Sequence, residues 1–206
     1  MPERWQVVAG FRPLTGYVLQ AALAQVRAWD AVGVAVPVAV NLSPRSLLDH
    51  ALPLEVARLL AVEDVEGSML ELEITENVIM ADPHRAASIL SSLNAQGIRL
   101  AIDDFGTGYS SLAHLRRLRV DTIKIDRSFV LHMATNTSDE LIVRSIVELA
   151  RNLGLVSVAE GVEDDETYDK LHRMGCDLVQ GYHLRQPQPA SELTPWLRER
   201  VAPVAA

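Results

Sequence analysis

The chain has 206 residues, which suits a single domain, and its 49% of hydrophobic residues can build a sizeable core. The 27 acidic and 19 basic residues give a net charge of −8, which argues against a protein that binds nucleic-acid polymers. Only one cysteine, Cys176, is present. The N-terminus leads to no sustained apolar region of a signal peptide, and the most apolar stretch is too short for a membrane span, so we expect a cytoplasmic protein without membrane contact.

Strand-like and helix-like segments alternate along the chain. The first predicted element is a helix over residues 14–29, capped by Thr15 and ended near Gly33. A buried strand follows over residues 35–44 and ends near Pro44, where the ring removes a backbone donor. Further apolar runs predict strands over residues 69–76, 98–104, 121–126, 155–161 and 177–184.

Helices are predicted between these strands. Asp82 and Pro83 begin one that ends at Gly97, and a shorter helix runs over residues 165–174. Ser138 is predicted to cap a long helix that Gly154 closes. The apolar stripe of that long helix comprises Ile142, Ile146, Leu149 and Leu153. Ser110 or Ser111 is predicted to cap a helix that carries Leu112, Leu115 and Leu118.

This alternation predicts an α/β fold with parallel strands and right-handed crossovers. Two architectures remain open at this point, an open doubly wound sheet and a (β/α) barrel. In either of them, the carboxyl ends of the strands share one rim, where active sites lie.

Polar side chains gather where the predicted strands end. They are Asn41, Glu71, Glu73, Glu76, Asp103, Asp104, Lys124, Asp126, Glu160 and Gln180. Because side chains alternate along a strand, Glu71 and Glu73 share one face while Leu72 and its apolar neighbours take the other. This parity favours a barrel in which apolar residues face the helices and polar residues point into the mouth.

The chemistry of this set is that of hard cations. Carboxylate and amide oxygens from Asn41, Glu73, Asp103, Asp104 and Glu160 suit Mg²⁺, Mn²⁺ or Ca²⁺, with Mg²⁺ or Mn²⁺ as the expected cofactor. Two such ions can hold a phosphodiester and activate a water, and a nearby lysine adds positive charge for the transition state. Any one of these carboxylates alone is more often a paired structural group, so the prediction rests on their coincidence across six strands.

Asp103 and Asp104 are adjacent and would point in opposite directions in a straight strand. Both can serve one site only if the backbone turns, and we expect Phe105–Gly106 to permit that turn.

The motifs VNLS, LELEITE, AIDDFGTGYSSL, IKIDRSFV, VAEGVE and QGYHL occur in this order. They resemble the successive motifs of the EAL domain family, bacterial cyclic-di-GMP phosphodiesterases with a TIM-like barrel. The resemblance runs from about Gly10 to Trp196. It implies a single domain with an N-terminal helical segment over about 1–34, a barrel core over 35–196 and a tail over 197–206.

The resemblance also implies roles for particular residues. Metal ligands would be Asn41, Glu73, Asp103, Asp104 and Glu160, with Lys124 near the attacking water and Glu160 as general base. We expect Gln180 and Asp126 to contribute to binding, and Glu76 to hold the DDFGTG loop. That loop and the helix after it imply a homodimer, and the implied ligand is cyclic-di-GMP.

One departure affects these expectations. The sequence contains no Glu-Ala-Leu motif, whose glutamate is a metal ligand in the family and is followed by a phosphate-binding arginine. We therefore expect an incomplete barrel of about six strands, lacking the first two strands of the family. Its open edges would be covered by a partner subunit, an exchanged segment or residues 5–11, unless the functional protein is longer at its N-terminus.

Two functions follow as hypotheses. The first is a metal-dependent phosphodiesterase that opens cyclic-di-GMP to linear pGpG and is impaired in this chain because a metal ligand and a phosphate clamp are missing. The alternative is a non-hydrolysing EAL module that acts through nucleotide binding or protein contacts.

Overall fold

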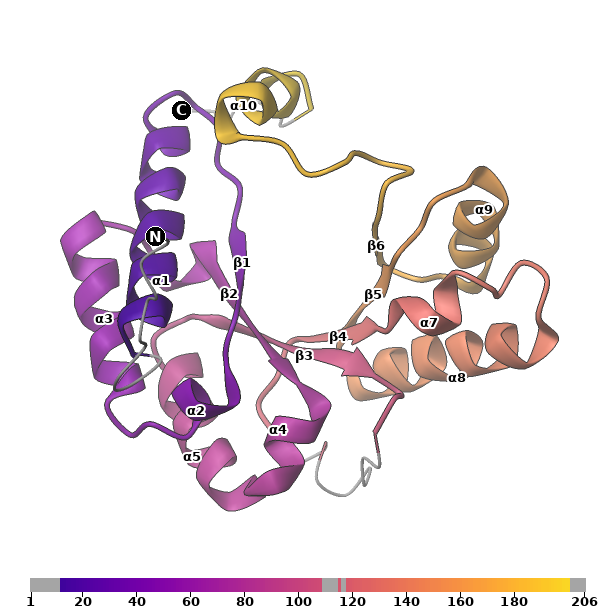
Figure 1. The fold of residues 1–206 in the computed structure, drawn as a ribbon, viewed down its shortest axis with the longest axis horizontal. Coiled ribbons are helices and arrows are strands. Elements are labelled where there is room, and N and C mark those ends of the chain that lie inside the picture. The colour runs from indigo at the N-terminus through magenta and orange to yellow at the C-terminus, as the bar shows by residue number, and fades with distance from the viewer. Residues whose placement is uncertain (1–11, 109–114, 116–117, 201–206) are drawn as a thin grey trace, which may run out of the picture.

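The computed structural model describes residues 12–108, 115 and 118–200, which form a parallel β-sheet with helices packed around it (Figure 1). Six strands follow one another across this sheet in chain order, and each neighbouring pair runs parallel. The strands are β1 (Val38–Asn41), β2 (Leu70–Thr75), β3 (Arg99–Phe105), β4 (Thr122–Ile125), β5 (Val156–Glu160) and β6 (Leu178–Gln180). The predicted α/β fold and its six parallel strands are confirmed.

Helices connect the strands and cover the outer face of the sheet (Figure 1). Before β3 lie α1 (Arg12–Asp30), α2 (Pro44–Leu47), α3 (Leu52–Glu63), the 3₁₀ turn Gly67–Met69, α4 (Glu76–Ala81) and α5 (Pro83–Asn94). After β4 lie α7 (Arg127–Val130), α8 (Thr137–Leu153), α9 (Asp165–Met174) and α10 (Ala190–Arg198). None of these described helices combines the length and apolar character needed to cross a bilayer.

The core lies between the outer face of the sheet and these helices. Leu70, Leu72 and Ile74 alternate along β2 and are fully buried, together with Leu90 and Leu93 of α5. The other face of β2 carries Glu71 and Glu73, as the predicted parity requires. Burial of the apolar face therefore fixes which side chains point to the inside of the curved sheet.

The sheet is an open half-barrel, because β1 and β6 pair with only one neighbouring strand each among the described residues. The chain leaves β6, crosses to the opposite side and forms α10 beside the end of α1 (Figure 1). There the indole Nε1 of Trp29 donates a hydrogen bond of 2.9 Å to the hydroxyl of Thr194. This contact links the first described helix to the last one.

Several predicted boundaries need correction. The strand expected over 35–44 is only Val38–Asn41, since Ser43 caps α2 and Pro44 begins it. The strand expected over 177–184 is only Leu178–Gln180, because the backbone turns after it.

Two predicted helix caps are wrong. Thr15 lies inside α1, and its hydroxyl forms a 2.7 Å hydrogen bond with the hydroxyl of Ser46. The cap of α8 is Asn136, whose side chain accepts from the backbone N–H of Ser138 at 2.9 Å. The caps predicted at Asp82 and Gly154 are confirmed.

The apolar stripe of α8 is rotated from the predicted one. Its buried residues are Val143, Ile146, Val147 and Ala150, whereas Ile142, Leu149 and Leu153 pack only partly buried against the core. The helix predicted after Ser110 or Ser111 falls mostly outside the described residues, as does most of the predicted tail.

Candidate functional site

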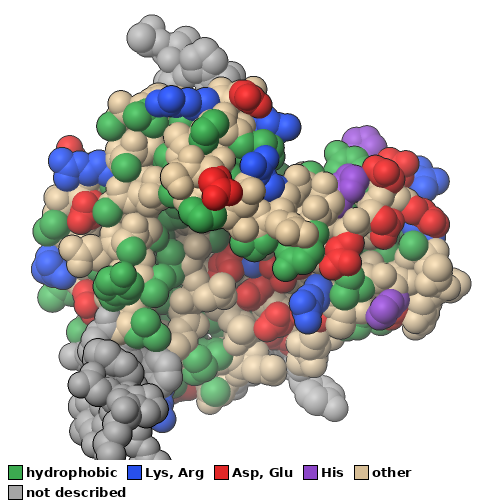
Figure 2. All heavy atoms as spheres, turned by 45° about the horizontal axis from the view of Figure 1, so that its top comes forward, with side chains coloured by type: hydrophobic (Ala, Val, Ile, Leu, Met, Phe, Trp, Pro, Cys, Tyr) green, Lys and Arg blue, Asp and Glu red, His purple; other side chains and the backbone are tan. Residues whose placement is uncertain are grey.

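Register places the predicted site residues on the inner face of neighbouring strands. Asn41 of β1 pairs with Glu73 of β2, and Glu160 of β5 pairs with Gln180 of β6. Asp103 of β3 pairs with Thr75, which lies two residues beyond Glu73 on the same face of β2. The carboxyl ends of five strands thus meet on one rim, as expected for parallel strands. Figure 2 shows acidic side chains around the hollow of one face of the molecule.

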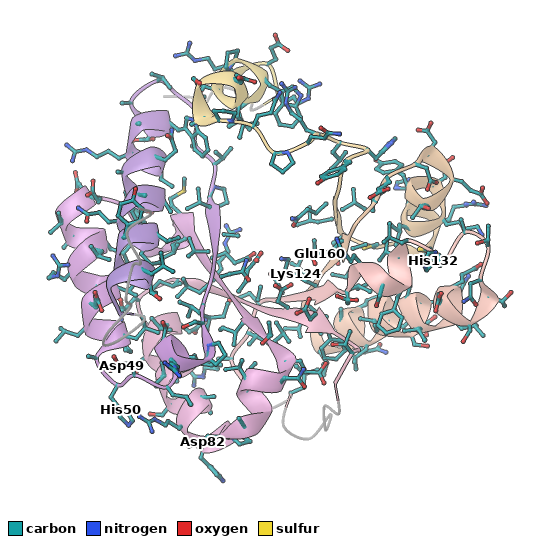
Figure 3. All side chains as sticks on the ribbon, in the orientation of Figure 1. Asp49, His50, Asp82, Lys124, His132 and Glu160 are labelled. Atoms are coloured by element: carbon teal, nitrogen blue, oxygen red, sulfur yellow. The ribbon has the colours of Figure 1, made fainter. Side chains whose placement is uncertain are left out.

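Lys124 of β4 lies at the centre of this group. Its Nζ is 2.6 Å from Oε1 of Glu73, 2.6 Å from Oε1 of Glu160 and 3.2 Å from Oδ1 of Asp103. Only 4% of the lysine is exposed. One ammonium therefore joins carboxylates from three other strands, and Figure 3 shows Lys124 and Glu160 side by side at the inner face.

The pKa values of this cluster reflect burial and pairing together. Burial lowers the pKa of Lys124, but hydrogen bonds with Glu160 and Glu73 outweigh it and raise the pKa above its usual value. Burial is also the largest cause that raises the pKa of Glu73 and of Glu160, and Lys124 offsets only part of that rise. Three carboxylates share one ammonium, so the cluster favours an additional positive charge.

A backbone irregularity brings Asp103 and Asp104 to the same site. The register between β3 and β4 shifts between Ile102 and Phe105, and Asp104 adopts a left-handed conformation with φ of 54°. The turn thus begins at Asp104, one residue before the predicted Phe105–Gly106. Left-handed backbone is costly for a residue other than glycine, and such strain is typical of functional sites.

Asp103, Asp104 and Glu160 each offer an oxygen within 4.8 Å of the others. Burial raises the pKa of Asp104, and repulsion by Asp103 adds to the rise. Oδ1 of Asp103 is buried and accepts no hydrogen bond from the described residues, although its ion-pair distance to Nζ of Lys124 is 3.2 Å. An all-oxygen group with an unfilled buried acceptor suits a hard divalent cation such as Mg²⁺, Mn²⁺ or Ca²⁺. A metal ion therefore fits these residues.

Asp126 extends this group from the end of β4. It caps α7 and accepts hydrogen bonds from the backbone N–H of Ser128 at 2.9 Å and from the Ser128 hydroxyl. Burial raises the pKa of Asp126, but these two bonds and one from Asp104 lower it below its usual value. Asp104 and Asp126 thus shift each other's pKa in opposite directions, up for Asp104 and down for Asp126.

Glu76 connects α4 to the loop after β3. Its Oε2 accepts a 3.0 Å hydrogen bond from the backbone N–H of Gly106, and only 2% of the residue is exposed. A Cβ atom on Gly108 would lie 2.7 Å from Oε1 of Glu76, so a side chain there would collide with the glutamate. Glu76 thus lies against the loop that follows Asp104 and the end of β3.

The two remaining predicted residues stay at the edges. Asn41 and Gln180 are exposed at the ends of β1 and β6, and no described residue bonds to either side chain.

One polar pair on the inner face was not predicted from the sequence. The Thr122 hydroxyl donates a hydrogen bond of 3.1 Å to Oε2 of Glu71. The sequence pattern that indicates this pair is the position of Thr122 two residues before Lys124, which places both side chains on the same face of β4. Figure 3 shows His50 and His132, both exposed, away from Lys124 and Glu160.

Comparison with known proteins agrees with this geometry. Residues 10–187 match the sequence model of the EAL domain. The chain belongs to the EAL domain family. A cyclic di-GMP phosphodiesterase of Pseudomonas aeruginosa is 37% identical over 187 residues, which cover 91% of this chain and 32% of the relative. The chain spans only 22 to 32% of the length of three curated relatives that it matches.

Solved EAL structures share the fold. The PaMucR phosphodiesterase in its c-di-GMP complex aligns with a TM-score of 0.85 and 41% identity, covering 88% of this chain and 74% of that one. The EAL domain of Mycobacterium smegmatis DcpA aligns with a TM-score of 0.86 and 39% identity, covering 92% of this chain and 86% of that one. Klebsiella pneumoniae BlrP1, in a calcium and cyclic-di-GMP complex, aligns with a TM-score of 0.77 and 30% identity, covering 86% of this chain and 45% of that one. The open half-barrel thus matches the TIM-like barrel of EAL proteins.

Proposed function

We propose that this chain is the hydrolytic module of a cyclic-di-GMP phosphodiesterase, which opens the cyclic dinucleotide to linear pGpG. The observation that carries the proposal is the cluster of Glu73, Asp103, Asp104 and Glu160 around Lys124. A relative and a solved structure that bear the name phosphodiesterase support it. Turnover by this chain is proposed to be weak, since β1 and β6 leave the described sheet open.

The proposed metal ligands are Asn41, Glu73, Asp103, Asp104 and Glu160, and the proposed ions are Mg²⁺ or Mn²⁺. When bound, two such cations neutralise phosphodiester oxygens and lower the pKa of a water. The calcium in the BlrP1 complex, a divalent ion in a related structure, supports the proposal that a divalent ion binds here.

The chain's own groups supply the remaining chemistry. Glu160, whose pKa burial raises, is proposed to accept the proton of the water that attacks phosphorus. The phosphorus–O3′ bond then breaks, and the leaving oxygen takes up a proton from solvent. Lys124 stays protonated and donates to the negative charge that develops on the phosphoryl oxygens. Asp126 and Gln180 contribute to binding at the rim, and Glu76 positions the loop through the Gly106 N–H.

The alternative is a non-hydrolysing EAL module. The observation that favours it is the open inner face, where Leu178 shares the face of Gln180 on the edge strand and is 56% exposed. An uncovered edge suits protein contacts. A homodimer through the DDFGTG loop and a cytoplasmic location remain predictions of the sequence.

The deciding experiment measures turnover and binding separately. The purified chain is incubated with cyclic-di-GMP and excess Mg²⁺ or Mn²⁺, and nucleotides are resolved by chromatography. We expect pGpG, and Glu160→Gln should lower the rate about 100-fold or more, because a general base contributes about 10²–10⁴-fold. Glu148→Gln, an exposed site on α8, is the matched control with unchanged turnover.

Calorimetric titration with cyclic-di-GMP separates the two candidates. Binding without product establishes the non-hydrolysing module. Turnover that Glu160→Gln leaves unchanged contradicts the proposed role of this residue.

A further inference from the structure

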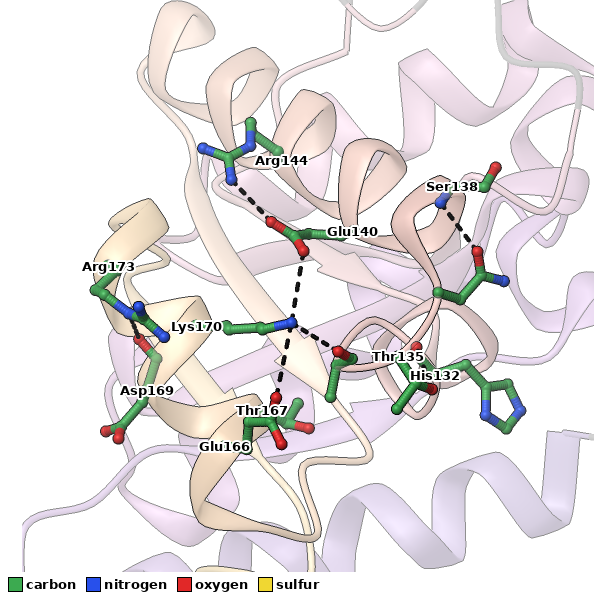
Figure 4. A network of polar contacts seen from close by, with 12 residues as sticks. His132, Thr135, Ser138, Glu140, Arg144, Glu166, Thr167, Asp169, Lys170 and Arg173 are labelled. Atoms are coloured by element: carbon green, nitrogen blue, oxygen red, sulfur yellow. Dashed lines mark hydrogen bonds and ion pairs between the residues drawn. The ribbon is translucent and has the colours of Figure 1, made fainter.

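A second cluster of charged side chains lies between α8 and α9, away from the inner face of the sheet (Figure 4). We call it the α8–α9 groove. It is a cavity of about 240 Å³ lined by Glu140, Arg144, Lys170, Arg173 and Met174. None of these residues has a part in the proposed hydrolysis.

Lys170 holds the centre of the groove in place. Its Nζ donates a 2.7 Å hydrogen bond to the carbonyl of Ala134 and lies 3.5 Å from Glu140 and 3.8 Å from Glu166. Arg151 donates to the carbonyls of Met174 and Gly175 at 3.3 and 3.2 Å, which ties α8 to the end of α9. The two helices are thereby held at a fixed separation, and the groove is preformed.

Two guanidinium groups flank this lysine with unused donors. Arg144 donates from one Nη to Glu140 at 3.0 Å, and its side chain is 47% exposed. Arg173 donates from Nε to the carbonyl of Asp169 at 3.2 Å. Across the described part of the chain, its terminal nitrogens meet no acceptor. Each arginine therefore offers N–H groups to a ligand.

The charge balance of the groove opposes that of the whole chain. Its lining carries three cations and one carboxylate, whereas the chain has a net charge of −8. The hydrogen bond from Arg144 lowers the pKa of Glu140, and Lys170 adds to this effect. The cations thus dominate the local potential, and the planar guanidinium forks match the oxygens of a phosphate.

We propose that the α8–α9 groove binds a phosphate group, with Arg144 and Arg173 as donors from facing helices and Lys170 between them. Glu140 competes with that anion for Arg144. The cavity is larger than an inorganic phosphate, so a small phosphate ester fits the same donors. The ligand class is therefore inorganic phosphate or a phosphomonoester.

Calorimetry on the full chain tests this proposal with inorganic phosphate and with GMP, in EDTA so that metal-bound carboxylates take no part. We expect saturable binding that Arg173→Ala weakens about tenfold, since a charge-assisted hydrogen bond is lost. Arg58→Ala removes an exposed arginine from α3 and is the matched control with unchanged affinity. Glu140→Gln should tighten binding several-fold, because it frees Arg144.

The outcomes are distinct. Equal affinity for phosphate and GMP assigns the groove to the phosphate group alone, and tighter GMP binding assigns it to a phosphomonoester. Absence of saturable binding by either probe, or equal weakening by Arg173→Ala and Arg58→Ala, overturns the proposal. These results do not depend on turnover of cyclic-di-GMP, which the metal-free buffer prevents.

Discussion

At the scale of single residues, Lys124 is the central side chain of the site, because three carboxylates of the site form ion pairs with it. It is one of two lysines in the chain, and it contacts carboxylates on β2, β3 and β5. Buried carboxylates without a cation are costly, so the lysine both stabilises the half-barrel and prepares its rim. Substitution of Lys124 in metal-free buffer measures its contribution to stability apart from any role in catalysis.

We expect Lys124→Met to lower the free energy of unfolding by about 3–5 kcal/mol, because it leaves buried carboxylates unpaired. Urea unfolding followed by circular dichroism in EDTA measures the loss. Lys170→Met is the matched control: its ion pairs lie near the surface, and we expect a loss of about 1 kcal/mol. Equal losses in the two variants would contradict a special role of the buried lysine.

A second residue-scale prediction concerns pH. Asp177 accepts hydrogen bonds from the hydroxyl and the backbone N–H of Ser157 at 2.7 and 2.8 Å. These two bonds lower the pKa of Asp177 below its usual value of 3.8. Because the folded state holds the proton less tightly than the unfolded state, this stabilisation is complete above about pH 4 and disappears as pH falls through the lowered pKa.

Asp177→Asn should therefore destabilise the protein by about 1 kcal/mol at pH 7, through weaker hydrogen bonds. The difference from the wild type should shrink below pH 4. Urea midpoints between pH 2.5 and 7 measure it, with Asp30→Asn, an exposed site at the end of α1, as the control. A difference that stays constant over this range would contradict the assignment.

At the scale of elements, glycine ends the long helix α8. Gly154 has a φ of 71° and its N–H bonds to the carbonyls of Ala150 and Arg151. A Cβ atom there meets nothing within 4 Å, so the cost of substitution is backbone strain alone. We expect Gly154→Ala to lower the free energy of unfolding by about 1 kcal/mol and Gly154→Asn by less, because asparagine tolerates this conformation. Chemical denaturation measures the free energy of unfolding of both variants. Equal losses in the two, or no loss in either, would contradict the backbone strain at this position.

The elements also show how far sequence reasoning reaches. Helix α9 was predicted with its observed bounds, since Asp164, the polar first turn and Gly175 are local signals. The cap of α8 is Asn136 and not the predicted Ser138. Serine and asparagine cap helices about equally well, so only the extended backbone at Asn136 decides between them. The φ of Asp104 could not be read from the sequence, since it results from the register shift against β4.

At the scale of the whole molecule, the sheet order explains why the site could be foreseen. Consecutive parallel strands place every strand end on one rim, so a polar residue at each end was enough to predict a common site. Which residues touch could not be predicted, because this depends on curvature. Curvature brings Glu73, Asp103 and Glu160 onto one ammonium and leaves Asn41 and Gln180 at the open edges.

The whole-molecule prediction follows from this gathering of charge. A divalent cation bound by Asp103, Asp104 and Glu160 would contact only the folded chain, because these side chains come together through β3 and β5. A free metal concentration of 100 times the Kd stabilises a protein by about 2.7 kcal/mol, which raises the Tm of a chain of this size by about 5–10 °C. Calorimetry with Mg²⁺ or Mn²⁺ against EDTA measures the shift.

Asp104→Asn should abolish most of this shift, since it removes a charged ligand from a strained position, and Glu148→Gln on the exposed face of α8 should retain it. An unchanged Tm in the wild type at millimolar metal would mean that Lys124 alone balances the carboxylates and that no ion binds the rim of this chain. A shift that persists in Asp104→Asn would place the ion elsewhere. The shift in Tm is independent of turnover, so it tests the metal site even if the open sheet prevents hydrolysis.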